Sequence, residues 1–218
     1  MERLDPATRR DRIEAGRVVL RRAVPSDLAM FHAAMSDPVV MRYWSTLPHP
    51  DLATTRDWLD GMIAADSGSS DDFVIEVDGE IVGQLNVSNI LYGSVSSATL
   101  GYWIAPEAAG RGVTPTAVAL VTDYFFNSVG LHRIEIDIRP ENEASLRVVE
   151  KLGFRYEGLK ERFIHINGSW RDHYVFALTA EEVPEGVLNR WQHKKVPKLN
   201  YPWQGKKVKK NEHAQFNE

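Results

Sequence analysis

The chain has 218 residues and no cysteine. This absence excludes disulfide bonds, a thiol nucleophile and cysteine-ligated zinc. The seven histidines are scattered and form no His-Glu-x-x-His pair, so we expect no metal cofactor.

Long apolar runs are absent as well, so no membrane span is expected from a sequence without ~18 consecutive apolar residues. The first five residues carry charges of both signs, which argues against a secretory signal. With no cysteine, the expected location is cytoplasmic. The 43% apolar content is typical of one globular domain with a sizeable core. We place that domain at residues 17–180, between an N-terminal extension (1–16) and a basic C-terminal tail (181–218).

Charge is unevenly distributed between the tail and the rest of the chain. Residues 190–218 contain one arginine and seven lysines against two glutamates, a net charge of +6. The whole chain has a net charge of −4, which leaves −10 for residues 1–189. An acidic body suits a cationic substrate and a basic tail suits an anionic partner, while a solvated, mobile tail is the alternative.

Hydrophobic periodicity predicts a mixed α/β sheet flanked by helices, with the order β-α-α-β-β-β-α-β-α-β-β. Asp78-Gly79 and Asn167-Gly168 predict two tight hairpins. Ser26 is expected to cap the first helix, and Gly130 and Gly153 to end the last two. The expected strands are 17–22, 73–78, 80–88, 98–104, 133–139 and a hairpin from 154 to 178, and the expected helices are 26–36, 52–65, 114–129 and 142–152.

A glycine-containing loop, 108–113, connects the expected strand 98–104 to the helix that begins at Thr114-Pro115. Glycine lets a backbone approach a ligand closely and present its N–H groups. The start of a helix adds unpaired N–H donors and a partial positive charge. The loop is therefore a candidate phosphate site.

Four strings in this order resemble the GNAT superfamily of acetyl-CoA-dependent N-acetyltransferases, and most closely its RimJ/RimL-like branch, which acetylates protein N-termini. They are Gly110-Arg111-Gly112, then Arg139-Pro140-Glu141-Asn142 with Ser145, then Lys151-Leu152-Gly153-Phe154, and finally residues 167–173. The resemblance implies a GNAT fold, an α/β (α+β) arrangement with a mixed, mostly antiparallel sheet of about seven strands and about four helices.

The resemblance also implies where acetyl-CoA binds. The diphosphate would lie on the backbone of Gly110, Arg111, Gly112, Val113 and Thr114. Two positions depart from the family pattern: Ala109 removes a side-chain contact and Pro115 removes one backbone donor, and Arg111 and Thr114 are expected to compensate. Further cofactor contacts are implied for Trp103 and Ile104 through their backbone, and for Asn142 and Ser145, although Asn142 is equally suited to capping a helix.

The acceptor amine must be neutral when it attacks. At pH 7 deprotonation costs roughly 1–1.4 kcal/mol for an α-amine and roughly 4.6 kcal/mol for a lysine, so an α-amine needs little help. RimL-like proteins carry a glutamate where this chain has Ile164. His165 is our first candidate for the base, against a strand histidine without catalytic duty, and Glu161 and Glu135 are alternatives.

Other residues are candidates for stabilising the transition state or binding the acceptor. The resemblance implies that Ser145 donates to the departing thiolate, and a first-turn capping serine is the alternative. Tyr102 and Tyr156 are further donors, although packing is the more usual role of such residues. The string 170–173 is implied to lie near the acceptor cleft, while Trp170 is equally suited to the core. With no cysteine available, transfer is expected to proceed directly in a ternary complex.

The preferred acceptor is a protein N-terminal α-amine. A narrow acidic pocket would instead favour a small amine such as a polyamine, an amino acid or an antibiotic. An open groove between residues 41–50 and the late hairpin would favour a peptide. A third interpretation is a ribosome- or RNA-binding factor that uses residues 206–210 with Tyr201 and Trp203 to bind phosphates and stack bases. The protein is expected to be a monomer or homodimer.

Overall fold

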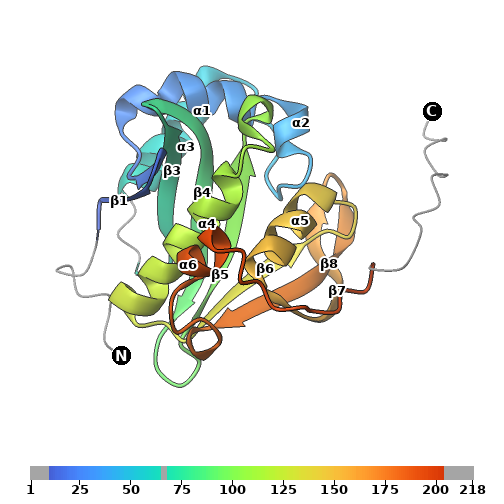
Figure 1. Ribbon diagram of the computed structural model, residues 1–218. Coiled ribbons are helices and arrows are strands. Elements are labelled where there is room, and N and C mark those ends of the chain that lie inside the picture. Colours follow the sequence, from blue (N-terminus) through green and yellow to red (C-terminus); the bar gives the residue numbers. More distant parts are fainter. Residues whose placement is uncertain (1–9, 65–67, 204–218) are drawn as a thin grey trace.

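The computed structural model describes residues 10–64 and 68–203, which form one eight-stranded sheet with helices on both faces (Figure 1). The strand order is β1-β2-β3-β4-β5-β6-β8-β7. Every neighbouring pair is antiparallel except β5 and β6. The strands are β1 (Arg12–Ala15), β2 (Val18–Arg21), β3 (Asp71–Val77), β4 (Glu80–Leu91), β5 (Ser97–Ile104), β6 (Arg133–Ile138), β7 (Arg155–Ile166) and β8 (Ser169–Thr179).

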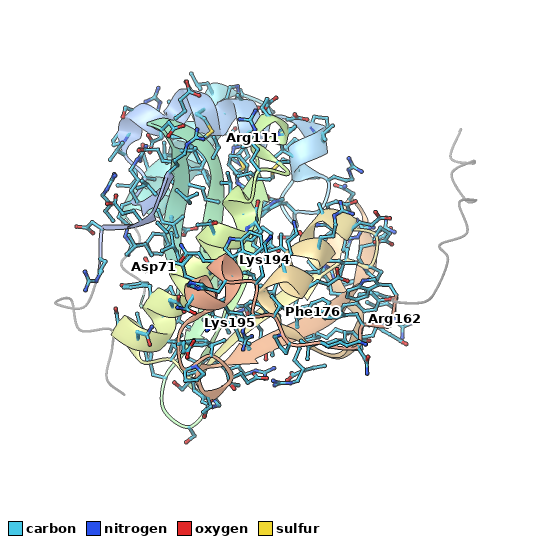
Figure 2. The ribbon with its side chains drawn as sticks, viewed as in Figure 1. Asp71, Arg111, Arg162, Phe176, Lys194 and Lys195 are labelled. Carbon is cyan, nitrogen blue, oxygen red and sulfur yellow. The ribbon has the colours of Figure 1, made fainter. Side chains whose placement is uncertain are left out.

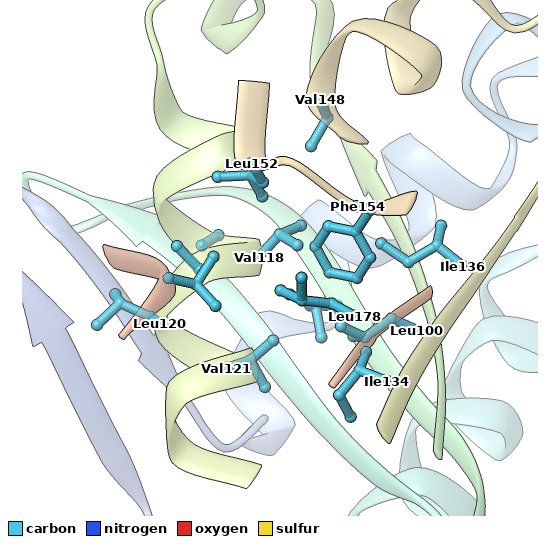
Figure 3. Packing of buried hydrophobic residues seen from close by; sticks show 14 of the residues in the cluster. Leu100, Val118, Leu120, Val121, Ile134, Ile136, Val148, Leu152, Phe154 and Leu178 are labelled. Atoms are coloured by element: carbon cyan, nitrogen blue, oxygen red, sulfur yellow. The ribbon is translucent and has the colours of Figure 1, made fainter. Parts of the chain in front are cut away.

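The larger core lies between the sheet and two helices, α4 (Val113–Tyr124) and α5 (Glu143–Leu152). Figure 3 shows Val118 and Val121 of α4 and Leu152 of α5 gathered around Phe154. Ile134 and Ile136 project from β6 into this core because alternate residues of a strand share one face. This packing fixes the start of α4 and the start of α5 relative to β5.

A smaller core covers the opposite face of the sheet. It is built from α1 (Leu28–Met35), α2 (Pro38–Met41) and α3 (Leu52–Ala64). Val74 and Trp103 supply the strand side, while their neighbours in sequence project to the first core. Helices therefore hold β5 from both sides.

Strands β5 and β6 separate soon after they meet. Their parallel ladder pairs only Ser97–Thr99 with Arg133–Glu135. The remainder of β5 stays paired with β4, and the remainder of β6 stays paired with β8. The sheet is thus split over the second half of β5, and the split provides space for a ligand.

Most local predictions are confirmed. Asp78-Gly79 and Asn167-Gly168 form the two hairpin turns, with positive φ at all four residues. Gly130 and Gly153 end their helices in the left-handed conformation. The predicted helix 114–129 is a true α-helix only to Tyr124 and continues as a π-helical turn, Phe125–Val129.

Two other local details differ from the predictions. Ser26 does not cap a helix: it lies inside a 3₁₀ turn, Pro25–Asp27, where Asp27 accepts from the Val24 N–H at 2.9 Å. A strand that was not predicted, β1, lies in the expected N-terminal extension, so the sheet has eight strands rather than seven.

The C-terminal segment packs against the sheet domain as far as it is described. It contains α6 (Val187–Gln192), which lies against α4, and two aromatic rings, Tyr201 and Trp203. Tyr201 is buried and its hydroxyl donates to the Phe154 carbonyl at 2.9 Å. Trp203 stacks on Tyr174. The mobile-tail interpretation therefore fails for this segment, and the Tyr201 ring is not available for stacking on bases; residues 206–210 lie outside the described part.

Candidate active site

The phosphate-loop candidate begins after a 3₁₀ turn, Pro106–Ala108, and ends at the first turn of α4. Gly110 and Gly112 have φ of 77° and 81°, values that strain any residue with a side chain. Gly112 is the N-cap of α4, so the N–H groups of Val113 and Thr114 fall in the first turn, where the helix offers them no acceptor. Figure 2 shows Arg111 at the end of the molecule where α4 begins.

A cavity of about 240 Å³ adjoins this loop. Its wall comes from the end of β5, the start of α4, and α5. Trp103, Ile104, Thr114, Asn142 and Ser145 line it, as expected from the sequence for cofactor contacts. Arg111, Gly112 and Val113 line a different groove of about 530 Å³, toward the turns β1–β2 and β3–β4.

Trp103 borders this cavity with its backbone, because its ring lies in the smaller core. The indole is buried in the smaller core, and its Nε1 donates to Gln84 Oε1 at 3.0 Å. Gln84 Nε2 in turn lies 3.1 Å from Asp72 Oδ1. Burial raises the pKa of Asp72, which the amides of Asn86 and Gln84 partly offset. This chain of side chains holds the back of β5 in place.

A second cavity, of about 170 Å³, occupies the split between β5 and β6. Five residues line both cavities, so the two are adjacent: they are Tyr43, Trp44, Tyr102, Asn142 and Ser145. The second cavity is also lined by Ser45 in the 41–50 loop, by Ile164 and Ile166 of β7, and by His173 of β8. A ligand arm entering beside α4 would thus end opposite residues from the late hairpin.

The Tyr102 hydroxyl lies where the two cavities meet. It is buried, and no described group makes a well-formed hydrogen bond with it. Burial raises the pKa of Tyr102 well above the ordinary tyrosine value, while the nearby Ser145 hydroxyl lowers it in part. Tyr102 therefore stays protonated, and its hydroxyl keeps a proton to donate.

Asn142 has the capping role that the sequence left open. Its Oδ1 accepts from the Ser145 N–H at 3.2 Å, at the start of α5. The cap fixes Ser145 and Asn142 relative to one another. Because Oδ1 is used in the cap, the Asn142 side-chain amide is the group left to contact a ligand.

His173 belongs to the string 170–173 that is expected near the acceptor cleft, but the sequence did not single it out as a base. It is 3% exposed, and Nδ1 lies 3.1 Å from the Arg171 carbonyl. A carbonyl can only accept, so Nδ1 carries the proton and Nε2 is the basic nitrogen of the neutral ring. Burial lowers the pKa of His173, while the neighbouring Asp137 raises it in part. The ring is consequently neutral at pH 7.

The hairpin register contained the signal for His173. The two-residue turn Asn167-Gly168 pairs Ile164 with Arg171, and cross-strand partners share a face. His173 is two residues beyond Arg171, so it lies on the same face as Ile164. His165 pairs with Trp170 and lies on the other face.

The residues predicted as bases lie away from the cavities. His165 is exposed and its ring contacts Trp170 with centroids 5.5 Å apart. Glu161 is exposed in an irregular stretch of β7. Glu135 is paired with Arg133 at 2.8 Å. Tyr156 packs against Tyr174 and does not line the cavities.

The second cavity carries few charges. Asp137 is its one lining carboxylate among the described residues, and Lys160 Nζ lies 3.0 Å from Asp137 Oδ1. Burial raises the pKa of Asp137, and the Lys160 ammonium partly offsets this rise. Arg139 is the cationic lining residue; it lies over the Tyr43 ring and pairs with Glu141. Tyr43 also donates to the Glu141 carbonyl at 3.3 Å, which ties the 41–50 loop to the β6–α5 connection.

A split mixed sheet, a glycine loop at a helix start and two adjoining cavities suit a long ligand that carries phosphate groups. The family described as Acetyltransferase (GNAT) domain matches residues 17–155. The chain belongs to this family, and the predicted RimJ-like GNAT fold is confirmed.

Three similar proteins bear on the acceptor. The Mycobacterium smegmatis RimJ structure in complex with CoA-disulfide is 36% identical, with a TM-score of 0.76 over 82% of this chain and 89% of that one. The Escherichia coli K12 [ribosomal protein uS5]-alanine N-acetyltransferase is 35% identical over 107 residues, 49% of this chain and 55% of the relative. This match therefore spans about half of that enzyme's length. The Escherichia coli K12 spermidine N(1)-acetyltransferase is 32% identical over 155 residues, 71% of this chain and 82% of the relative.

In residues 10–64 and 68–203, no group of three or more His, Cys, Asp and Glu side chains is arranged to hold a metal ion. Across the same ranges, none of the helices combines the length and apolar character needed to cross a membrane.

Proposed function

We propose that this GNAT acetyltransferase transfers the acetyl group of acetyl-CoA to the α-amine of a protein N-terminus. The acyl donor would enter by the cavity between β5 and α5, and the acceptor amine by the cavity between the 41–50 loop and the late hairpin. Both would meet at Tyr102 and Ser145, which line both cavities.

The charge of the acceptor cavity carries this choice of substrate. A polyamine has several ammonium groups, and each needs a carboxylate or a cluster of carbonyls when it leaves water. The lining offers one carboxylate, Asp137, and Lys160 already neutralises it. Isoleucines 136, 138, 164 and 166 form much of the remaining wall. Such a pocket suits one small terminal residue with a single amine.

The residues divide the chemistry as follows. Nε2 of His173 accepts the proton that the amine loses as its nitrogen bonds to the acetyl carbon. The hydroxyls of Tyr102 and Ser145 hydrogen-bond to the sulfur as the carbon–sulfur bond breaks. The thiolate takes one proton from Tyr102, and the proton held on His173 returns to Tyr102 through solvent, so that the products are the amide and the CoA thiol. Backbone N–H groups of Val113 and Thr114 hold the diphosphate, and Asn142 contacts the pantetheine arm. Direct transfer needs no covalent enzyme intermediate.

Spermidine-like amines are the second candidate, because of the match to spermidine N(1)-acetyltransferase over 71% of this chain. A matched panel separates the two. Thiol release from acetyl-CoA is measured with peptides that have a free N-terminal alanine or serine, with the same peptides blocked at the N-terminus and carrying one lysine, and with spermidine and spermine.

We expect the free-N-terminus peptides to give kcat/KM at least about tenfold above the polyamines. Asp137→Asn is the matched variant. It should change the peptide rate little, because the α-amine attacks as the neutral form. A polyamine rate above the peptide rate that collapses in Asp137→Asn would overturn the peptide assignment and establish the second candidate.

A further inference from the structure

A relay of two hydrogen bonds connects the C-terminal segment to the phosphate loop. Trp191 Nε1 of α6 donates to Thr116 Oγ1 at 3.0 Å, and Thr116 Oγ1 donates to the Gly112 carbonyl at 2.9 Å. A hydroxyl has one proton, so donation to Gly112 leaves the Thr116 oxygen as the acceptor for Trp191. The Thr116 N–H also lies 3.2 Å from the Gly112 carbonyl.

The relay controls the direction of a neighbouring N–H. The Gly112 carbonyl and the Val113 N–H belong to one planar trans peptide group, so they point in opposite directions. Holding the carbonyl toward Thr116 therefore aims the Val113 N–H away from the helix. Gly112 has φ of 81° and no side chain of its own to fix the peptide group, so its orientation rests on the first hydrogen bond of α4, from the Thr116 N–H, and on the relay through the Thr116 hydroxyl.

Trp191 is itself held by several contacts. Asp123 near the end of α4 accepts from the N–H groups of Val187 and Leu188, at 2.6 and 3.0 Å, and so anchors the start of α6. Arg190 donates to the carbonyls of Leu152 and Gly153 at the end of α5. The Trp191 ring lies close to Gly112, since a Cβ built there would be 3.6 Å from Cζ2. Its position is consequently fixed by both helices that border the cofactor cavity.

We propose that Trp191 is a positioning residue for the diphosphate of CoA, acting through Thr116 on the peptide group between Gly112 and Val113. The inference rests on the proposed function, because it places the diphosphate at this loop. Residue 191 lies beyond the family match, which ends at residue 155. The relay is thus a property of this chain's own C-terminal segment.

Trp191→Phe keeps most of the ring and removes the donor, and Thr116→Val removes the hydroxyl. Calorimetric titration with CoA should show Kd raised roughly three- to tenfold in each, the range expected for one neutral hydrogen bond. The double variant should be no weaker than the worse single variant, because both changes break one relay. Turnover should give the same division: kcat/KM falls with acetyl-CoA and is unchanged with acetyl-pantetheine, which lacks the diphosphate.

Trp203→Phe is the matched control. It removes an indole donor from the same C-terminal segment. Trp203 Nε1 donates to Glu150 Oε1 at 2.5 Å, and Glu150 belongs to α5 rather than to the phosphate loop. It should leave the CoA Kd unchanged even where it lowers the melting temperature. The inference alone is overturned if Trp191→Phe and Trp203→Phe raise the CoA Kd equally. It is also overturned if kcat/KM falls as much with acetyl-pantetheine as with acetyl-CoA. A wild-type protein that takes up no CoA overturns the proposed function and this inference with it.

Discussion

Two polar atoms in the split between β5 and β6 define the site at the scale of single residues. The Tyr102 hydroxyl is buried without a well-formed bond among the described residues, and the His173 ring has its Nδ1 fixed by the Arg171 carbonyl. Buried polar groups without partners cost stability, so folds retain them where a ligand supplies the partner. Tyr102 and His173 line the same cavity, which is the physical basis for assigning the Tyr102 hydroxyl as the donor and the His173 ring as the base.

Tyr102→Phe removes only the unsatisfied hydroxyl. We expect kcat to fall about 10²-fold, because the departing thiolate loses a donor. Thermal stability should stay the same or rise slightly, since a buried group without a partner is removed. Tyr156→Phe is the control, as its ring packs against Tyr174 outside the cavities. A variant at position 102 with the wild-type kcat would remove Tyr102 from the mechanism.

His173→Gln should lower kcat by about 10²-fold or more through loss of the base. Burial lowers the pKa of His173, so the wild-type ring is already neutral at the pH where an ordinary histidine is half protonated. It becomes protonated only at lower pH. The wild-type kcat should therefore fall only as the pH drops below ~6.5, and the variant should lose this acid limb.

His165→Gln is the paired control, because that ring is exposed on the opposite face of the hairpin. It should retain the wild-type rate and pH profile. If the acid limb disappears with position 165 and persists with position 173, the two assignments must be exchanged.

At the scale of elements, ion pairs stabilise the half of the sheet that carries the acceptor side. Arg133 of β6 bonds Glu135 on its own strand and reaches across β8 to Glu157 of β7. Arg155 donates to the same glutamate at 2.8 Å. Glu157 thus connects the outer strand to β6 over the strand that carries His173.

Glu157→Gln tests this connection through its pH dependence. Arg133 and then Arg155 hold the pKa of Glu157 below its ordinary value, against the opposing effect of burial. A carboxyl group whose pKa is lower in the folded than in the unfolded protein stabilises the fold at pH values above the unfolded-state pKa. This stabilisation is lost as the pH falls through the folded-state pKa. We expect urea unfolding to show a loss of about 1 kcal/mol at neutral pH that disappears in the acid range. Glu143→Gln, in an exposed pair with Arg147, should change stability by less than about 0.5 kcal/mol.

The helices, strands and turns were predictable from local signals, whereas the pairing of distant segments was not. Dipeptides such as Asp78-Gly79 restrict the backbone by themselves, and Gly153 ends a helix through its own conformation. The exact point where β5 and β6 separate depends on the partners of each strand, so no local pattern contains it. His173 was not considered as a base for a related reason: the alternation was considered on one strand, whereas the register across Asn167-Gly168 places Ile164 and His173 together.

For the whole molecule, the segment 183–203 is part of the folded body rather than an appendage. It covers Phe154 and Phe176 with Tyr201 and Trp203, and it borders the phosphate loop with Trp191. Sequence composition concealed this because the lysines suggested a solvated tail, while the few aromatic residues determine the packing. Burial also raises the pKa of Tyr201 to about 12, which keeps its hydroxyl a donor.

Tyr201→Ala should therefore behave as a core substitution. The ring is 6% exposed, so its removal is expected to cost about 3–5 kcal/mol, as for other large buried aromatic side chains. Trp170→Ala removes a larger ring that is 62% exposed and should cost far less. Denaturant unfolding measures both, and a Tyr201→Ala protein as stable as Trp170→Ala would show that the segment does not pack as described.

We propose that the split between β5 and β6 delivers acetyl groups to an N-terminal α-amine. The most direct measurement uses one peptide with both a free N-terminal alanine and an internal lysine, incubated with acetyl-CoA and the wild-type protein, and locates the added acetyl group by tandem mass spectrometry. We expect acetylation at the α-amine, lost in His173→Gln and retained in His165→Gln. Acetylation at the lysine, or a peptide left unmodified while spermidine is acetylated, would contradict it.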